Sequence, residues 1–265
     1  MMPEQVSQVI SIAEAAGTAI LEVYRSGELG ITQKDDESPL TLADQRADQI
    51  IVQGLQALTP SIPILTEESA QEEYGVRKGW ETFWLVDPLD GTKEFIKRTG
   101  QFTVNIALIT RGKPVLGVVY APAIKLLYRA EQGEGAYRRD QNGERAVTSR
   151  QANRDDLSIV ASRDHAGPQV ESLKESFPGC GLKSMGSSLK LCLVAEGEAD
   201  LYLRDGPTME WDTGAAQAIV EEAGGSVTEW LGTTGGDPLR YNKEVLRNPP
   251  FLVKGDQGLE VKLPA

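Results

Sequence analysis

The stretch from residue 83 to residue 92 reads Phe83-Trp84-Leu85-Val86-Asp87-Pro88-Leu89-Asp90-Gly91-Thr92. Its first four residues form an apolar run that is typical of a buried strand, and the Pro-Leu that follows cannot begin a helix. Asp87 and Asp90 are therefore expected at the end of a strand. Carboxylates without a neighbouring histidine or cysteine suit a hard cation such as Mg²⁺, which keeps several waters and shares its other positions with phosphate.

Two further acidic positions point the same way. Residues 62–65 predict a second strand, which delivers Glu67 at its end, so that two strand ends would converge on one place. Asp212 precedes a helical pattern over residues 213–223 and would ordinarily cap that helix. Capping and ligation are compatible, because one carboxylate oxygen can accept a backbone N–H while the other reaches a metal. The four carboxylates indicate metal-assisted phosphate chemistry.

A turn is the structural alternative for residues 87–90, because Asp-Gly is a common turn signal and its carboxylate can cap backbone donors. On these residues alone the two interpretations are about equally good. A helix that begins at Gly91-Thr92 would direct free backbone N–H groups at the carboxylates. That arrangement would place a phosphate site beside the metal site.

Composition limits the class of protein. With 265 residues, 40% of them hydrophobic, the chain can bury a substantial core as one large domain or two small ones. The net charge of -12 would repel polyanions, so we expect no nucleic acid partner, whereas a small phosphorylated substrate is compatible with it. Cys180 and Cys192 show no spacing that suggests a disulfide framework or a zinc site.

Nothing at the N-terminus resembles a targeting signal, because no basic region followed by an apolar run is present. The sequence also shows no uncharged apolar stretch that we expect to span a bilayer. We therefore expect a cytoplasmic enzyme without membrane insertion.

The pattern of apolar residues divides the chain into two halves. Helical periodicity from Val6 to Tyr24 and from Ala43 to Leu58 predicts two helices, the first of them covering a sheet and the second carrying Asp44 in its first turn. From Thr103 to Tyr137 the pattern predicts an antiparallel meander. The polar stretch 138–156 has no apolar periodicity, and shorter strands and helices alternate beyond it. We expect an α+β half over residues 1–152 and an α/β half over residues 153–265.

Two motifs in this order carry a resemblance to a known family: Asp87-Pro88-Leu89-Asp90-Gly91-Thr92, and Trp211-Asp212-Thr213-Gly214-Ala215 followed by Glu222-Ala223-Gly224-Gly225. The whole chain resembles the lithium-sensitive, magnesium-dependent phosphatases of the inositol monophosphatase superfamily. It is most similar to the CysQ branch of 3'(2'),5'-bisphosphate nucleotidases, on Lys93-Glu94-Phe95 and Gly186-Ser187-Ser188-Leu189-Lys190-Leu191-Cys192. The resemblance implies a layered α-β-α-β-α sandwich with the metals between its halves.

The resemblance also implies a set of metal ligands. Glu67, Asp87 and the carbonyl of Leu89 would bind one Mg²⁺. Asp87, Asp90 and Asp212 would bind a second, and a third, weaker ion would depend on Glu67 and waters. Paired ions suit hydrolysis, because one lowers the pKa of the attacking water and the other stabilises the leaving oxygen.

Catalytic roles follow from the same resemblance. Glu67 acts through its metal, and Thr92 would orient the attacking water and pass a proton toward Asp44, which requires hydrogen-bond contact between the two. Without the resemblance, Asp44 would be interpreted as a capping or exposed helix residue.

Substrate binding is implied at six positions. Gly91 and Thr92 would hold the reacting phosphate, while Ser187 and Lys190 share one helix face and would bind the second phosphate of a nucleotide. Arg204 would help to neutralise that phosphate, although a surface ion pair is the more common role of an arginine. The family places a histidine near the nucleotide, at the position of His165, the only histidine here.

We therefore expect a Mg²⁺-dependent enzyme with two to three ions that removes the 3'-phosphate of adenosine 3',5'-bisphosphate, and also of 3'-phosphoadenylyl sulfate, by direct attack of water. The substrate would be a small nucleotide, and the protein a monomer or homodimer. The first alternative is an inositol monophosphatase or sugar bisphosphatase of the same superfamily. A non-catalytic binding protein on this fold is the second, which the intact carboxylate set disfavours.

Overall fold

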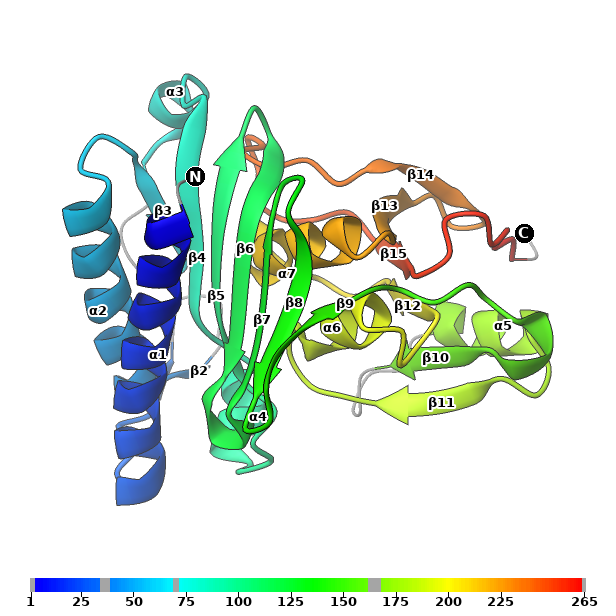
Figure 1. Ribbon diagram of the computed structural model, residues 1–265, viewed down its shortest axis with the longest axis horizontal. Helices are drawn as coiled ribbons and strands as arrows, with labels where there is room; N and C mark the ends of the chain where they lie inside the picture. Colours follow the sequence, from blue (N-terminus) through cyan, green and yellow to red (C-terminus); the bar gives the residue numbers. More distant parts are fainter. Residues whose placement is uncertain (1–2, 34–38, 69–71, 162–167, 264–265) are drawn as a thin grey trace.

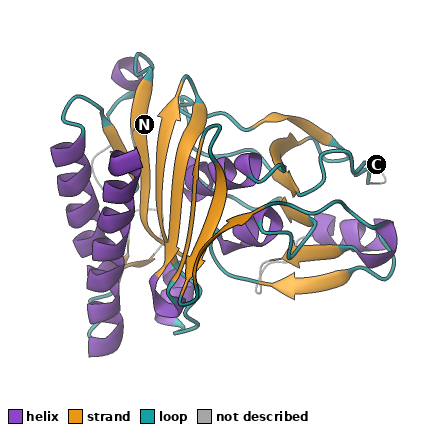
Figure 2. Cartoon of the chain, viewed as in Figure 1, coloured by secondary structure: helices purple, strands orange, loops and turns teal. Residues whose placement is uncertain are grey.

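Helices and sheets alternate through the protein in five layers (Figure 1). The structure is a computed structural model that describes residues 3–33, 39–68, 72–161 and 168–263. α1 (Pro3–Ser26) and α2 (Leu42–Leu58) cover one face of a seven-stranded sheet. α6 (Leu189–Ala195) and α7 (Glu210–Glu222) lie between that sheet and a six-stranded one, whose outer face packs on α5 (Pro168–Ser176). Figure 2 shows the same order of helix and strand layers, which confirms the predicted α-β-α-β-α sandwich.

In the first sheet, the spatial order of the strands is their order in the chain. Its strands, in spatial order, are β3 (Ile64–Thr66), β4 (Thr82–Asp90), β5 (Thr103–Thr110), β6 (Lys113–Ala121), β7 (Leu126–Glu131), β8 (Gly135–Asp140) and β9 (Gly143–Val147). β3 and β4 are parallel, and every later pair is antiparallel, which confirms the predicted meander. No strand was predicted within the polar stretch 138–156, although the end of β8 and the whole of β9 lie there. β9 lies at the edge of the sheet with mostly exposed side chains, so it lacks the apolar alternation that reveals a strand.

The second sheet contains crossovers. Its spatial order is β11 (Gly181–Ser184), β10 (Ser158–Ala161), β12 (Leu201–Arg204), β15 (Phe251–Lys254), β13 (Ser226–Trp230) and β14 (Gly235–Pro238). β10 is parallel to both of its neighbours, and the remaining pairs are antiparallel. The first sheet ends at Val147 and the second begins at Ser158, while the boundary between residues 152 and 153 stays a prediction.

The short elements complete the chain. They are β1 (Thr32–Gln33), β2 (Pro39–Leu40), α3 (Tyr74–Arg77), α4 (Thr92–Ile96) and the 3₁₀ turns η1 (Pro122–Ile124) and η2 (Arg154–Asp156). α4 begins where a helix was predicted.

α1 is a core helix. Val9, Ala13 and Ile20 recur at helical spacing, are fully buried, and belong to the hydrophobic cluster that α1 and α2 form with the first sheet. By length and composition, residues 4–26 are long and apolar enough to cross a membrane, although they include Glu14 and are therefore not the uncharged stretch whose absence was expected. Half of its most apolar window is buried inside the protein, as expected of a helix that covers a sheet.

Candidate active site

A parallel strand pair brings Glu67 and Asp87 together. Thr66, the last residue of β3, lies opposite Val86 of β4, and the N–H of Glu67 donates to the Val86 carbonyl at 3.2 Å. Parallel strands end at the same edge of a sheet, so the residues that follow them are neighbours. The convergence predicted for the two strand ends is therefore present in the structure.

A β-bulge places Asp87 and Asp90 on the same face of the sheet. Asp87 lies opposite Asn105 and Asp90 opposite Thr103, so three steps along β4 match two steps along β5. In a regular strand, residues three apart point to opposite faces, and the extra residue of the bulge restores the same face. The Pro88-Leu89 insertion thus explains why the two carboxylates are three positions apart.

Asp212 reaches this place from the other side of the site, on α7. The helix begins at Glu210, so the predicted start at Thr213 was wrong, and Asp212 lies in the first turn rather than before it. One carboxylate oxygen of Asp212 accepts the Met209 N–H at 2.8 Å, which is the capping bond expected of it. Carboxylate oxygens of Asp87, Asp90 and Asp212 all lie within 4.8 Å of one another.

Close packing of α7 on the sheet fixes that position. A Cβ on Gly117 of β6 would lie 2.1 Å from the Ala215 carbonyl oxygen, a distance that no side chain tolerates. Gly214 likewise approaches Leu85, because its own Cβ would lie 3.0 Å from a Leu85 methyl carbon. These close approaches determine how far α7, and with it Asp212, lies from the sheet.

The electrostatics of the cluster favour the binding of a cation. Burial, and then repulsion from Glu67, raises the pKa of Asp87 well above its usual range. Burial, and then repulsion from Asp90, raises the pKa of Asp212 to about 8. The pKa of Asp90 is also raised by burial, although Lys190 and the Ser188 N–H oppose the shift. A donor set made entirely of converging carboxylate oxygens fits Mg²⁺.

Thr92 lies between the carbonyl of Leu89 and the carboxylate of Asp44. Its hydroxyl is 3.3 Å from the Leu89 oxygen and 3.4 Å from Oδ1 of Asp44. The other oxygen of Asp44 accepts the N–H and the hydroxyl of Thr41 at 2.8 and 2.6 Å, which caps α2. Burial raises the pKa of Asp44, and the bonds from Thr41 oppose that rise. Asp44 is therefore a buried helix-capping residue that also contacts Thr92.

Residues 186–190, called the grip below, pack against Gly91 at the start of α4. A Cβ on Gly91 would lie 3.4 Å from that of Ser187, and Gly91 itself has a φ of +90°. Ser187 also has a positive φ, +51°, which is uncommon for a residue other than glycine and marks a strained backbone. Two hydrogen bonds hold the grip in place. The Gly186 N–H donates to the Gln101 side chain at 2.9 Å, and the Ser188 N–H donates to Asp90 at 2.6 Å.

Lys190 is a buried cation at this position. Its Nζ donates to the Ser187 carbonyl at 2.6 Å and lies 5.6 Å from the centre of the Tyr202 ring. Burial lowers the pKa of Lys190 to about 8, and the nearby charge of Arg204 also lowers it, whereas Asp90 raises it. Arg204 donates to the Pro207 carbonyl at 3.2 Å. Its effect on the pKa of Lys190 shows that the two side chains lie near each other. His165 lies outside the described residues.

Sequence reasoning missed two polar residues behind the carboxylates. Thr103 and Asn105 are buried in β5, and both contact the hydroxyl of Ser188, at 2.9 and 2.8 Å. Their sequence signal was present, because they are polar residues at alternating positions of an otherwise apolar strand.

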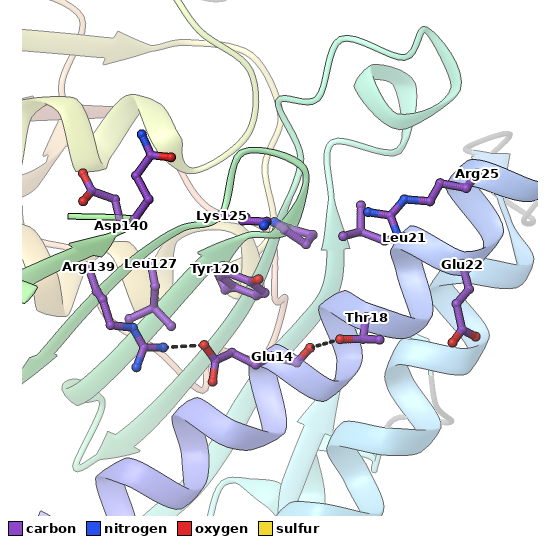
Figure 3. A pocket seen from close by; sticks show the side chains of 12 residues that line it. Glu14, Thr18, Leu21, Glu22, Arg25, Tyr120, Lys125, Leu127, Arg139 and Asp140 are labelled. Atoms are coloured by element: carbon purple, nitrogen blue, oxygen red, sulfur yellow. Dashed lines mark hydrogen bonds and ion pairs between the residues drawn. The ribbon is translucent and has the colours of Figure 1, made fainter. Parts of the chain in front are cut away.

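A separate cavity of about 510 Å³ lies between α1 and strands β6 to β8 (Figure 3). Its wall includes Glu14 and Arg139, which form an ion pair, together with Tyr120. None of the predicted site residues that the structure describes lines this cavity.

Comparison with known proteins agrees with the motifs. Residues 2–257 match the model of the inositol monophosphatase family. The 3'(2'),5'-bisphosphate nucleotidase CysQ of Salmonella typhimurium is 47% identical over 248 residues, which cover 93% of this chain and 98% of that protein. The same-named protein of Escherichia coli K12 is 46% identical with the same coverage. The crystal structure of CysQ from Bacteroides thetaiotaomicron superimposes with a TM-score of 0.83 at 42% identity and covers 96% of this chain and 98% of the other.

Proposed function

This chain belongs to the inositol monophosphatase family, as its two motifs predicted, and we propose that it removes the 3'-phosphate from adenosine 3',5'-bisphosphate. Its high identity to the CysQ nucleotidases over nearly the whole length supports a phosphatase that acts on a small nucleotide. The sulfated precursor, 3'-phosphoadenylyl sulfate, is a second substrate of the same kind. We place the enzyme in the cytoplasm, as a monomer or homodimer.

One contact is the main support for a substrate with two phosphates. The Ser188 N–H donates to Asp90 at 2.6 Å, which joins the carboxylate cluster directly to the grip that holds the buried cation of Lys190. The cluster suits one phosphate through metal ions, and Lys190 offers a second centre of positive charge a short distance away. Two phosphates on one small substrate match two such centres.

Two to three Mg²⁺ ions would be held by this chain. Glu67, Asp87 and the Leu89 carbonyl would hold one ion. Asp87, Asp90 and Asp212, whose carboxylates converge, would hold the second. When bound, the metals supply a water of lowered pKa and charge stabilisation for the leaving oxygen. With four carboxylates around two divalent ions, the local charge is close to zero before the substrate arrives.

The side chains around the metals have distinct roles. Thr92 orients the attacking water and passes a proton toward Asp44, whose other oxygen is fixed by Thr41. Lys190 binds the second phosphate by exchanging its bond to the Ser187 carbonyl for charge-assisted bonds to phosphate oxygens. Arg204 adds positive charge at the same place, and His165 contacts the nucleotide.

Release of inorganic phosphate tests the proposal against its alternatives. Adenosine 3',5'-bisphosphate and inositol 1-phosphate are compared with Mg²⁺, with chelator, and with Mg²⁺ plus Li⁺. We expect turnover of the bisphosphate that requires Mg²⁺ and is inhibited by Li⁺. A preference for inositol phosphate would identify an inositol monophosphatase, and turnover of neither compound would favour a binding protein.

A further inference from the structure

Asn105 carries a buried amide group with an unused donor. Its side chain is 1% exposed, and its Oδ1 accepts the Ser188 hydroxyl at 2.8 Å. Within the part of the chain that the structure describes, its Nδ2 is one of three buried side-chain nitrogens without a hydrogen-bond partner, and the other two belong to arginines. An unsatisfied buried donor is unfavourable, so an amide retained in this state implies a partner that arrives later.

The neighbour of this amide across the strands is Asp87. The two residues are register partners in the antiparallel pair of β4 and β5, so their side chains leave the same face a few ångströms apart. Of the other two carboxylates, Asp90 accepts the Ser188 N–H from across the site, and Asp212 accepts the Met209 N–H at the start of its own helix. Asp87 accepts only the N–H of Leu89, two residues ahead in its own bulge, among the hydrogen bonds that the described residues make to it.

The carbonyl end of the same side chain reaches the grip. The Ser188 hydroxyl lies between Asn105 and Thr103, and the Ser188 N–H is bonded to Asp90. These bonds fix the residue that follows the strained backbone of Ser187. One asparagine thus stands between the residue that anchors the grip and a carboxylate of the metal cluster.

We propose that Asn105 is a positioning residue that couples the two centres, with its carbonyl oxygen holding Ser188 and its amide donating to Asp87 in the magnesium-loaded protein. Carboxylates that ligate a metal are themselves oriented by hydrogen-bond donors behind them, and the loss of such a donor weakens metal binding. The part of the proposal that concerns Ser188 rests on the proposed function, because it assumes that the grip binds a substrate phosphate. The Asp87 half rests only on metal binding.

The test measures Mg²⁺ binding by titration calorimetry without substrate, and then kcat and KM for adenosine 3',5'-bisphosphate and adenosine 3'-monophosphate. Asn105→Leu keeps the branched shape of the side chain, although it is larger, and removes both of its polar ends. We expect it to raise the Mg²⁺ Kd about tenfold or more. It should also raise KM for the bisphosphate more than KM for the monophosphate.

Ser188→Ala is the matched variant, because it removes the hydroxyl at the carbonyl end of Asn105 and keeps the backbone N–H on Asp90. It should raise the bisphosphate KM and leave the Mg²⁺ Kd within about twofold of wild type, by the same argument. If Asn105→Leu does not fold, Asn105→Ser, whose hydroxyl is too short to reach both partners, is measured with the same expectations.

An Asn105 variant with a lowered melting temperature but a wild-type Mg²⁺ Kd would overturn the coupling and leave only a structural role. An equal rise in KM for both substrates would overturn the Ser188 half. Failure of the proposed function looks different, because wild-type protein would not hydrolyse the bisphosphate while the effect of Asn105 on the Mg²⁺ Kd persisted.

Discussion

The hydroxyl of Thr92 contacts Oδ1 of Asp44 at 3.4 Å, although the two residues lie 48 positions apart in the sequence. The second oxygen of the same carboxylate is held by Thr41, so the cap of α2 directs Asp44 toward Thr92. This contact is what a proton path from an attacking water requires.

Replacing Asp44 by asparagine should lower kcat by about 10²-fold or more, because an amide cannot accept the proton that Thr92 passes on. The Mg²⁺ Kd should change little, since Asp44 is not among the proposed ligands. Thr41→Val is the control: it removes the hydroxyl that caps α2 and bonds Asp44, but keeps the Thr41 N–H on the same Asp44 oxygen. It costs about 1 kcal/mol of stability and should lower kcat far less, because the carboxylate can still accept a proton. Steady-state kinetics and thermal melts separate the two effects, and an Asp44→Asn enzyme with half of wild-type kcat would rule out the relay.

Asp90→Asn should abolish turnover of every substrate, because Asp90 belongs to the proposed second metal site. The same change also weakens the bond that holds the Ser188 N–H. Calorimetry should show fewer Mg²⁺ ions bound per chain. Full Mg²⁺ stoichiometry together with lost activity would mean that Asp90 acts in another way.

The stability of the metal-free protein should fall as pH rises. The folded-state pKa of Asp212, about 8, lies above its usual value of 3.8, so folding favours the protonated acid. Its contribution to stability is complete below pH 4 and is lost as pH rises toward 8. In chelator, Asp212→Asn should therefore be more stable than wild type at pH 8, by on the order of a few kcal/mol, and nearly equal to it at pH 4.

Saturating Mg²⁺ should remove this difference, because ions that bind only the folded wild-type protein stabilise it by mass action. Melting temperatures at pH 4 and pH 8, with chelator and with Mg²⁺, provide the measurement. A wild-type protein that is equally stable at both pH values in chelator would show that the carboxylates are not forced together by the fold.

Gly117→Ala tests the position of α7. The added methyl would meet the Ala215 carbonyl at 2.1 Å, so the helix must move away from β6 and take Asp212 with it. We expect a loss of roughly 1–3 kcal/mol of stability and a weaker Mg²⁺ affinity. Gly133→Ala, at a glycine of positive φ with open space around it, is the control for backbone strain without a clash. A Gly117→Ala protein with wild-type Mg²⁺ affinity would mean that Asp212 does not depend on this contact.

Local patterns predicted the elements well where one face is apolar, as in α1 and in the strands from β4 to β7. They failed at β9, where both faces of an edge strand are exposed, and at the start of α7, where Trp211 and Asp212 form part of the first turn. Helix starts depend on capping contacts, and the bond from Met209 to Asp212 becomes visible only when the helix is built.

The candidate site could be predicted for a similar reason. Its carboxylates follow strand ends or begin helices, which are positions that a sequence reveals. The two motifs, in their order along the chain, identified the family. Asn105 could not be assigned in this way, because its importance depends on the bulge that aligns Asp87 with it and on Ser188, which is 83 positions away.

The central claim is that the metal site is joined to a grip that binds the second phosphate. The most direct test compares kcat/KM for adenosine 3',5'-bisphosphate with kcat/KM for adenosine 3'-monophosphate, in wild type and in Lys190→Ala. Lys190 is a buried cation beside Ser187, so its loss should cost the bisphosphate roughly 10- to 100-fold, about 1.4–2.8 kcal/mol. The monophosphate, which lacks the second phosphate, should lose little, and the ratio should fall accordingly. An equal loss on both substrates would contradict the account.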